Sequence, residues 1–124
     1  MDAHGIHHLG VAVDDLDEAI ETYTRLFGGE LERRDRVEEQ GVEAASVRVG
    51  AARVELLAAT GAETPVGKFL AKRGPGMHHV AYEVDDIHEA LRELAREGAQ
   101  LVDDEPHAGL FGLQVGRASC RERV

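Results

Sequence analysis

Residues 6–19 of the chain read IHHLGVAVDDLDEA, and residues 77–90 read MHHVAYEVDDIHEA. The two stretches are 71 residues apart, and seven of their fourteen positions are identical. Shared His-His, Val-Asp-Asp and Glu-Ala pairs in one register do not readily arise by chance. Because two copies are too few for a solenoid, the repeat predicts a pseudo-symmetric fold of two paired halves.

Each copy begins with an apolar, β-rich run and continues with a helical pattern. Residues 6–13 and 77–84 are predicted strands. The paired aspartates that follow each strand suit the N-cap of a helix, and apolar residues then recur at helical spacing. Gly28 and Gly98 are expected to end these two helices.

Three further strands are predicted in the first half, at residues 30–37, 42–49 and 52–58. A short helix is expected after Pro65, between the halves. Only 26 residues follow Gly98, whereas the first half uses about 30 between its helix and the end of its last strand. The predicted fold class is therefore α+β, with two βαβββ modules of which the second is incomplete.

Length and composition limit the class of protein. The chain has 124 residues, a formal net charge of −10 and 43% hydrophobic residues, which predicts one globular domain. Nucleic acids and acidic membranes need dense Lys and Arg, so the charge argues against both partners. The sequence has no apolar run of roughly 20 residues, no signal-peptide pattern and one cysteine, and we therefore expect a cytoplasmic location.

The histidines of the repeat are the strongest candidates for chemistry. His8 and His79 occupy equivalent positions, and a pseudo-twofold would bring equivalent strands side by side with both rings in one cavity. Imidazole is the commonest metal ligand and suits first-row divalent ions. Since strand side chains alternate between faces, His7 and His78 are expected to point the other way and not to be ligands. An isolated histidine on a sheet face would more simply be a satisfied polar residue.

Glu55 is the candidate carboxylate partner of these histidines. It lies among the apolar residues Val54, Leu56, Leu57 and Ala58 of a predicted strand, and the alternative is an outward-facing residue on a half-solvated strand. Adding the repeat offset of 71 to position 55 gives position 126, so its symmetry mate would fall just beyond Val124. We therefore expect a site with three protein ligands, weak metal binding and little activity.

Weaker acidic signals lie near the predicted strand 42–49. Glu38, Glu39 and Glu43 form a patch that is either a solvated edge or the source of a catalytic base. The chain has no P-loop, no dinucleotide-binding glycine fingerprint and no Gly-x-Ser-x-Gly elbow.

Two βαβββ modules that each open with a histidine resemble the vicinal oxygen chelate fold of the glyoxalase, bleomycin resistance and dioxygenase superfamily. Within that superfamily, the chain is most similar to the methylmalonyl-CoA epimerases, over about residues 4–112. The most specific segment is 65–87, PVGKFLAKRGPGMHHVAYEVDDI. Further matches, in the order and nearly the spacing of the family, are IHHLGVA at 6–12, EQGVE at 39–43, VELL at 54–57 and DEP at 104–106.

The resemblance implies a metal-dependent isomerase that interconverts (R)- and (S)-methylmalonyl-CoA through an enolate. It makes His8, Glu55 and His79 metal ligands, with cobalt as the foremost ion and manganese, nickel or zinc as alternatives. The family's fourth ligand, a Glu in a Gly-Val-Leu-x-Glu-Leu strand, has no counterpart in the chain. An acyl-CoA thioester substrate and a homodimer are also implied.

The resemblance further places a catalytic base shortly after Gln40-Gly41, and Glu43 is the candidate. Several relatives carry this carboxylate one position later, where this chain has Ala44. One residue along a strand reverses the face, so the register of this strand decides whether Glu43 reaches the metal.

Residues 116–124, GRASCRERV, resemble the translation of a sequencing adapter. We expect one domain over 4–115, with repeat one at about 4–59 and repeat two at about 77–115. The segment 116–124 has no β pattern, and it is expected to be a non-native tail that does not complete the sheet.

Two other functions stay open from the sequence. One is another enzyme of the superfamily, such as a glyoxalase-type isomerase or a lyase, because one metal geometry serves several reactions. The other is a metal-free module that sequesters small molecules such as drugs. The three candidate ligands argue against the binding module, and metal content would separate the two classes.

Overall fold

The computed structural model describes residues 1–110 and 113–119. The chain separates into two compact units, one formed by Gly5–Tyr82 and the other by Met1–His4 together with the chain from Glu83 onward. The boundary between Tyr82 and Glu83 falls inside the second copy of the sequence repeat. The division into a single domain over residues 4–115 stays a prediction.

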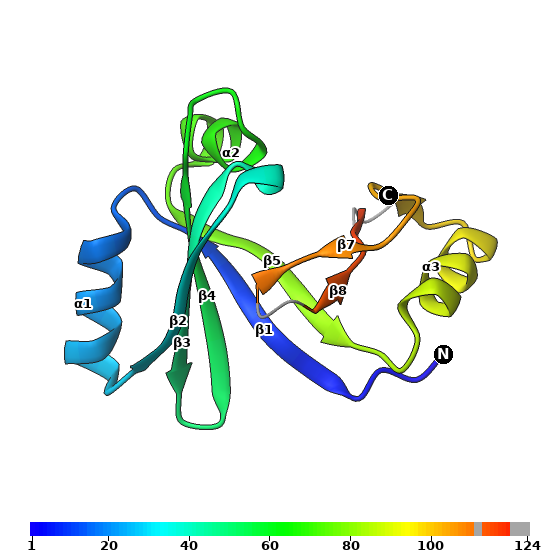
Figure 1. Cartoon of the computed structure of the whole chain (residues 1–124), viewed down its shortest axis with the longest axis horizontal. Coiled ribbons are helices and arrows are strands. Elements are labelled where there is room, and N and C mark those ends of the chain that lie inside the picture. Colours follow the sequence, from blue (N-terminus) through cyan, green and yellow to red (C-terminus); the bar gives the residue numbers. More distant parts are fainter. Residues whose placement is uncertain (111–112, 120–124) are drawn as a thin grey trace. The chain divides into compact units, whose positions relative to one another are not determined.

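The first unit is a five-stranded sheet with two helices (Figure 1). Its strand order is β2-β3-β4-β1-β5, in which β1 runs parallel to β4 while β2, β3 and β4 are successively antiparallel. The elements in chain order are β1 (Gly5–Ala12), α1 (Leu16–Phe27), β2 (Glu30–Val37), the 3₁₀ turn η1 (Glu38–Gln40), β3 (Val42–Val49), β4 (Ala52–Ala59), α2 (Pro65–Arg73) and β5 (Gly76–Glu83).

Local signals in the sequence set the ends of the helices. The Asp15 side chain accepts a hydrogen bond from the backbone N–H of Glu18 and caps α1, and the Thr64 side chain caps α2 through Gly67. Gly28, with φ 65°, adopts the left-handed conformation that ends α1. The predicted strands 30–37 and 42–49 match β2 and β3, and the other predicted elements of this unit shift by one residue at most.

The hydrophobic core lies between α1 and one face of the sheet. Leu16 of α1 packs there against Ala45 and Val47 of β3 and Leu56 of β4, all at most 5% exposed. We call this the helix face of the sheet. Figure 1 shows α1 running along β2, β3 and β4 on this side.

The strand register places other side chains on the opposite face of the sheet, which we call the open face because α1 does not cover it. Part of this face is buried as well, since Ala12, Ala44 and Leu57 are at most 3% exposed. Gly10 of β1 pairs with Glu55 of β4, which also pairs with Ser46 of β3. Because side chains two apart on a strand share a face, His8 and Arg53 also belong to the open face.

Among the residues that the structure describes, the second unit contains the helix α3 and four short strands. These are α3 (Ile87–Arg96), β6 (Gln100–Leu101), β7 (His107–Ala108), β8 (Gln114–Val115) and β9 (Ala118–Ser119). Asp86 caps α3 by accepting hydrogen bonds from the backbone N–H groups of His88 and Glu89. The short strands form two-stranded ladders, β6 with β9 and β7 with β8. The mixed α+β class expected from the repeat is confirmed.

Residues 116–124 are not expected to complete the sheet, and Ala118–Ser119 lie outside the five-stranded sheet, in a separate two-stranded pairing with Gln100–Leu101. Arg117, in the same segment, donates two hydrogen bonds of 2.9 Å to the Asp103 carboxylate, and His107 Nε2 lies 2.9 Å from that carboxylate. Arg117, followed by His107, lowers the pKa of Asp103 to about 2. Backbone pairing with β6 and the ion pair of Arg117 with Asp103 therefore hold residues 117–119 in place, although their sequence has no strand pattern. Cys120 and Glu122 lie outside the described residues.

Among the helices that the structure describes, none is long and apolar enough to cross a lipid bilayer.

The position of the core predicts that two leucines of the first unit contribute very differently to the free energy of unfolding. Leu56→Ala removes a side chain that is 0% exposed, and it is expected to lower the free energy of unfolding by about 2–5 kcal/mol. Leu26→Ala, at a side chain that is 57% exposed, is the matched control and is expected to cost well under half as much. Urea unfolding followed by circular dichroism measures both. Equal losses would contradict the assigned core.

Candidate metal centre

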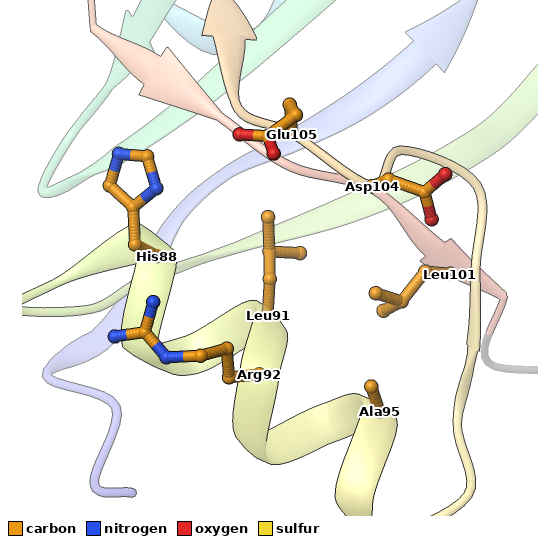
Figure 2. Close-up of a pocket in the computed structure, with 7 residues that line it drawn as sticks. All are labelled: His88, Leu91, Arg92, Ala95, Leu101, Asp104 and Glu105. Atoms are coloured by element: carbon orange, nitrogen blue, oxygen red, sulfur yellow. The ribbon is translucent and has the colours of Figure 1, made fainter.

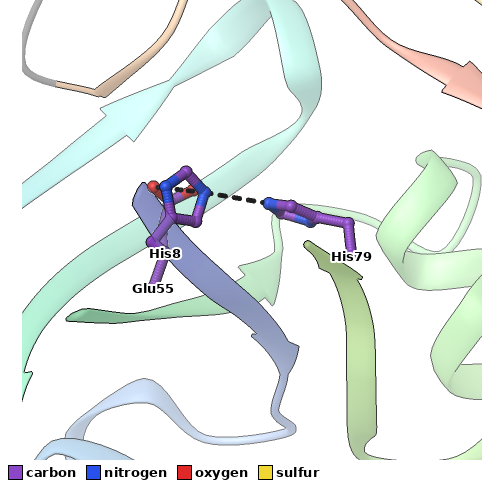
Figure 3. Close-up of side chains that lie close together, drawn as sticks. All are labelled: His8, Glu55 and His79. Atoms are coloured by element: carbon purple, nitrogen blue, oxygen red, sulfur yellow. Dashed lines mark hydrogen bonds and ion pairs between the residues drawn. The ribbon is translucent and has the colours of Figure 1, made fainter. Parts of the chain in front are cut away.

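Three half-buried side chains converge on the open face of the first unit (Figure 3). His8 Nε2 lies 3.1 Å from His79 Nε2 and 3.5 Å from Glu55 Oε2. One donor atom from each residue lies within 4.8 Å of those from the other two. The side chains come from β1, β4 and β5, which are neighbours in the sheet. The structure thus brings together the three residues expected from the sequence as a metal-binding set.

A missing side chain makes room for this arrangement. The His79 ring lies over Gly10, and a Cβ atom at Gly10 would fall only 2.1 Å from the ring atom Cε1. The equivalent position in the second copy of the repeat is Ala81. Gly10 therefore admits the His79 imidazole to the side of β1 that carries His8.

Burial disfavours the charged forms of two of the three donors, His8 and Glu55. Burial, followed by the charges of His79, His7 and Arg53, lowers the pKa of His8 to about 4. Burial raises the pKa of Glu55 to about 7. Although His8 and Glu55 are close enough for an ion pair, both shifts oppose charge on them, so this contact is not a conventional salt bridge at neutral pH.

The donor set fits a first-row divalent cation. Adjacent ligands on one ion, with bonds of about 2.1 Å, lie roughly 3.0–3.4 Å apart, close to the two separations measured here. Neutral imidazole nitrogens and one carboxylate oxygen are ligands that zinc, cobalt, nickel and manganese accept. A cation would also stabilise the ionised form of Glu55, which burial alone disfavours.

His7 and His78 are not among the three clustered donors, yet they are close to them. His7 Nδ1 lies 2.9 Å from His8 Nδ1, and His78 Nδ1 lies 3.1 Å from His79 Nδ1. Neighbouring strand residues have their Cβ atoms on opposite faces, but the two rings of each pair meet edge to face with centroids 5.2–5.4 Å apart. His7 and His78 thus lie outside the ligand cluster, as expected. Their contact with the rings of His8 and His79 was not expected.

Glu43 is not brought to the cluster. It alternates with Ala44 and Ser46 on β3 and lies on the helix face. Its carboxylate accepts hydrogen bonds from Arg34, which also pairs with Asp17 of α1. The register thus places position 44, which is an alanine in this chain, on the face that carries Glu55.

Sequence reasoning missed the polar groups beside the cluster on the open face. Arg53 lies two residues before Glu55, and its Nε donates a 2.8 Å hydrogen bond to Glu32 of β2. Glu32 is also bonded to the buried Ser46 and lies 3.6 Å from Arg48, and the arginines help to lower its pKa. Strand alternation alone could have placed Arg53 on the same face as Glu55. Its pairing with Glu32 could not be predicted, because it depends on an irregularity in strand pairing between Leu31 and Arg33.

The second unit holds a hollow of different character, with a volume of about 290 Å³ (Figure 2). Its lining comes from α3, with His88, Leu91, Arg92 and Ala95, and from the segment after that helix, with Leu101, Asp104 and Glu105. None of the candidate ligands lines it. Its mixed charges do not indicate a particular ligand.

Comparisons with known proteins show the family of the chain. The family described as the Glyoxalase/Bleomycin resistance protein/Dioxygenase superfamily matches residues 7–116. An uncharacterised protein of Bacillus subtilis, YqjC, is 33% identical and aligns over 94% of this chain and 84% of its own. The mitochondrial methylmalonyl-CoA epimerase of Dictyostelium discoideum is 32% identical over 89% of this chain and 67% of its own.

Solved structures show the same likeness. The methylmalonyl-CoA epimerase of Mycobacterium tuberculosis superposes with a TM-score of 0.91 at 32% identity, covering 94% of this chain and 79% of that one. A methylmalonyl-CoA epimerase solved in complex with methylmalonyl-CoA and NH4+ has the same TM-score and identity, covering 95% and 86%.

The raised pKa of Glu55 predicts how a variant changes the stability of the metal-free protein. The folded pKa of about 7 lies above the ordinary 4.5, so the ionised carboxylate destabilises the fold increasingly as the pH rises from 4.5 through 7. Glu55→Gln is therefore expected to stabilise the protein at pH 8, on the order of 1–3 kcal/mol, and to have little effect near pH 4.5. The lowered pKa of His8 acts in the opposite sense but is common to both proteins.

Urea unfolding in the presence of a chelator, repeated from pH 4.5 to 8, measures this difference. Glu21→Gln, at an exposed glutamate of α1, is the control and should show no such trend. A stability gain from Glu55→Gln that is the same at every pH would contradict the burial of an ionisable carboxylate.

Gly10 yields a steric prediction. Gly10→Val places atoms where the His79 ring lies and is expected to weaken Co²⁺ binding by roughly tenfold or more, because one ligand is displaced. Gly76→Val is the control, since a Cβ atom at Gly76 meets nothing within 4 Å. Titration with Co²⁺, followed by visible absorption, compares them, and circular dichroism checks the fold. Unchanged affinity in a folded Gly10→Val protein would contradict the role of His79.

Proposed function

The chain belongs to the Glyoxalase/Bleomycin resistance protein/Dioxygenase superfamily, and from this premise we propose that it is a metal-dependent epimerase that interconverts (R)- and (S)-methylmalonyl-CoA through an enolate. The observation that carries the proposal is the convergence of His8, Glu55 and His79 on one face of the sheet. The relatives and solved structures named as methylmalonyl-CoA epimerases support this choice of substrate.

The reaction needs a site that stabilises negative charge. The α-carbon lies between a thioester and a carboxylate, and its proton must leave from one side and return from the other. A divalent ion, with cobalt foremost and manganese, nickel or zinc as alternatives, would supply Lewis acidity for the charge that develops on the thioester oxygen. His8 and His79 would hold that ion through Nε2, and Glu55 through a carboxylate oxygen.

The surroundings of the three ligands suit this task. Side-chain exposures of 11% for His8 and 13% for Glu55 limit the access of water to these donors. Electrostatic interactions in such a partly dry site are stronger than in bulk water. The low pKa of His8 keeps its imidazole neutral at physiological pH, which is the form that binds metal.

The acid and base of the reaction must lie on opposite sides of the α-carbon. Glu43 faces α1 and is paired with Arg34, so we propose that proton exchange does not depend on it. We further propose that the protein acts as a cytoplasmic homodimer on its acyl-CoA substrate, as the family resemblance implies.

A glyoxalase-type isomerase or a lyase is the second candidate, because the same ligand set serves other reactions of the superfamily. A metal-free binding module is disfavoured by the cluster itself, since such a module has no need of three convergent donors.

Exchange of the α-proton of methylmalonyl-CoA in deuterated water tests the proposed reaction. Exchange is expected to require added Co²⁺ and to fall by roughly 100-fold or more in His8→Ala, which removes a ligand. Glu43→Gln is expected to change the rate little. A chain whose residues from 113 onward are replaced by an ending that contains Gly-Val-Leu-x-Glu-Leu supplies a fourth carboxylate and is expected to exchange faster.

Three outcomes would contradict parts of this proposal. Exchange that survives both a chelator and His8→Ala would exclude the metal-dependent mechanism. A large loss in Glu43→Gln would restore that residue as a base. Tight metal binding without exchange, in the original and the re-ended chain alike, would favour another reaction of the superfamily.

A further inference from the structure

Four imidazoles in the first unit form a continuous chain, in the order His7, His8, His79 and His78. The contacts are Nδ1 to Nδ1 at 2.9 Å, Nε2 to Nε2 at 3.1 Å and Nδ1 to Nδ1 at 3.1 Å. The two inner rings therefore use different atoms for different neighbours. Their Nε2 atoms face each other within the ligand cluster, and their Nδ1 atoms face the outer rings.

The same arrangement occurs in both copies of the repeat. The outer histidine precedes the inner one along the chain in each copy, and the two pairs are 71 residues apart. Both pairs are T-shaped, with interplanar angles of 81° and 84°. Two independent strands thus present a ligand histidine whose second nitrogen contacts a preceding histidine.

Each contact between two ring nitrogens needs one proton, carried by one of the two atoms. If His8 carries its proton on Nδ1, it donates to His7, and its Nε2 lone pair is free for a metal ion. If His7 donates instead, His8 must carry its proton on Nε2, which blocks metal binding there. The same reasoning applies to His78 and His79, so binding through Nε2 requires both outer rings to accept.

We propose that His7 and His78 are positioning residues, which accept hydrogen bonds from Nδ1–H of His8 and His79 and thereby fix the tautomer and orientation of the two metal ligands. This inference rests on the proposed metal-binding function of the cluster. Hydrogen-bond partners of ligand histidines usually are carboxylates, carbonyls or water, and here neutral imidazoles take that place.

The environment of His78 keeps the outer ring in place. Phe69 of α2 packs edge to face against the His78 ring, with centroids 4.9 Å apart. The guanidinium of Arg73, also on α2, lies 6.0 Å from the centroid of the Phe69 ring. Helix α2 therefore supports His78, which in turn contacts the ligand His79.

Two substitutions at each outer position separate hydrogen bonding from ring packing. Phenylalanine keeps a planar ring but has no nitrogen, whereas asparagine places its amide near the position of Nδ1. Partners of metal ligands usually contribute about 10- to 100-fold in affinity. His7→Phe and His78→Phe are expected to weaken Co²⁺ binding by about this factor, while His7→Asn and His78→Asn should retain most of the affinity.

The experiment is a Co²⁺ titration of the whole chain and its variants, followed by visible absorption, with circular dichroism to confirm folding. Long-range ¹H–¹⁵N spectra of the Zn²⁺-loaded protein provide a second readout that does not depend on activity. They are expected to show Nδ1–H tautomers for His8 and His79 and Nε2–H tautomers for His7 and His78.

The outcomes separate this inference from the proposed function. Wild-type affinity in both Phe variants, or equal losses in the Phe and Asn variants, would overturn the positioning role. So would Nδ1–H tautomers on His7 and His78. Failure of the metal-binding function would appear differently, as a wild-type chain that takes up no Co²⁺ or as full binding by His8→Ala.

Discussion

The parallel pairing of β1 with β4 is the constraint on which the site depends. Its register aligns Gly10 with Glu55, so that His8, two residues earlier, projects on the same face as that carboxylate. Val11 of β1 and Val54 of β4, which alternate with these residues, belong to the opposite face and pack against the core under α1. A shift of one residue in this pairing would expose the core and remove both ligands at once, because side chains alternate with a period of two. Packing against α1 therefore also fixes the face on which the candidate metal ligands lie.

The site places donors where their charged forms are disfavoured. Burial raises the pKa of Glu55 and lowers that of His8, and both shifts reduce the attraction that an ion pair would supply. The Nε2 contact between His8 and His79 needs a proton when no cation is present, although metal binding requires both lone pairs to be free. The ligand geometry and the electrostatics thus favour the same occupant, a cation that replaces this proton and stabilises the carboxylate.

The repeat predicted β1 and β5, the helices that follow them and the two histidines, while local residue patterns predicted β2, β3, β4 and the helix after Pro65. Glu55 was proposed because it is a carboxylate among apolar strand residues and because of the family resemblance. The sequence could not decide whether Glu43 faces the candidate site, because that depends on whether position 43 or position 44 of β3 lies on the same face as Glu55. The register and the ion pair with Arg34 place it under α1. Arg117 and Ala118–Ser119 were missed because their order comes from partners distant in sequence, Asp103 and Gln100–Leu101.

The ring contact of His7 with His8 shows where alternation along a strand stops being a complete guide. Alternation assigns Cβ atoms to faces, but an imidazole extends far enough for its Nδ1 to meet that of the next residue beside the strand. In two adjacent histidines of which one is a candidate ligand, the other ring can therefore form a hydrogen bond with the ligand nitrogen that the metal does not use. Duplication of the strand duplicates this feature, so each half contributes a ligand together with its own hydrogen-bond partner. Glu55 has no such twin among the described residues, and the symmetry of the centre is confined to its histidines.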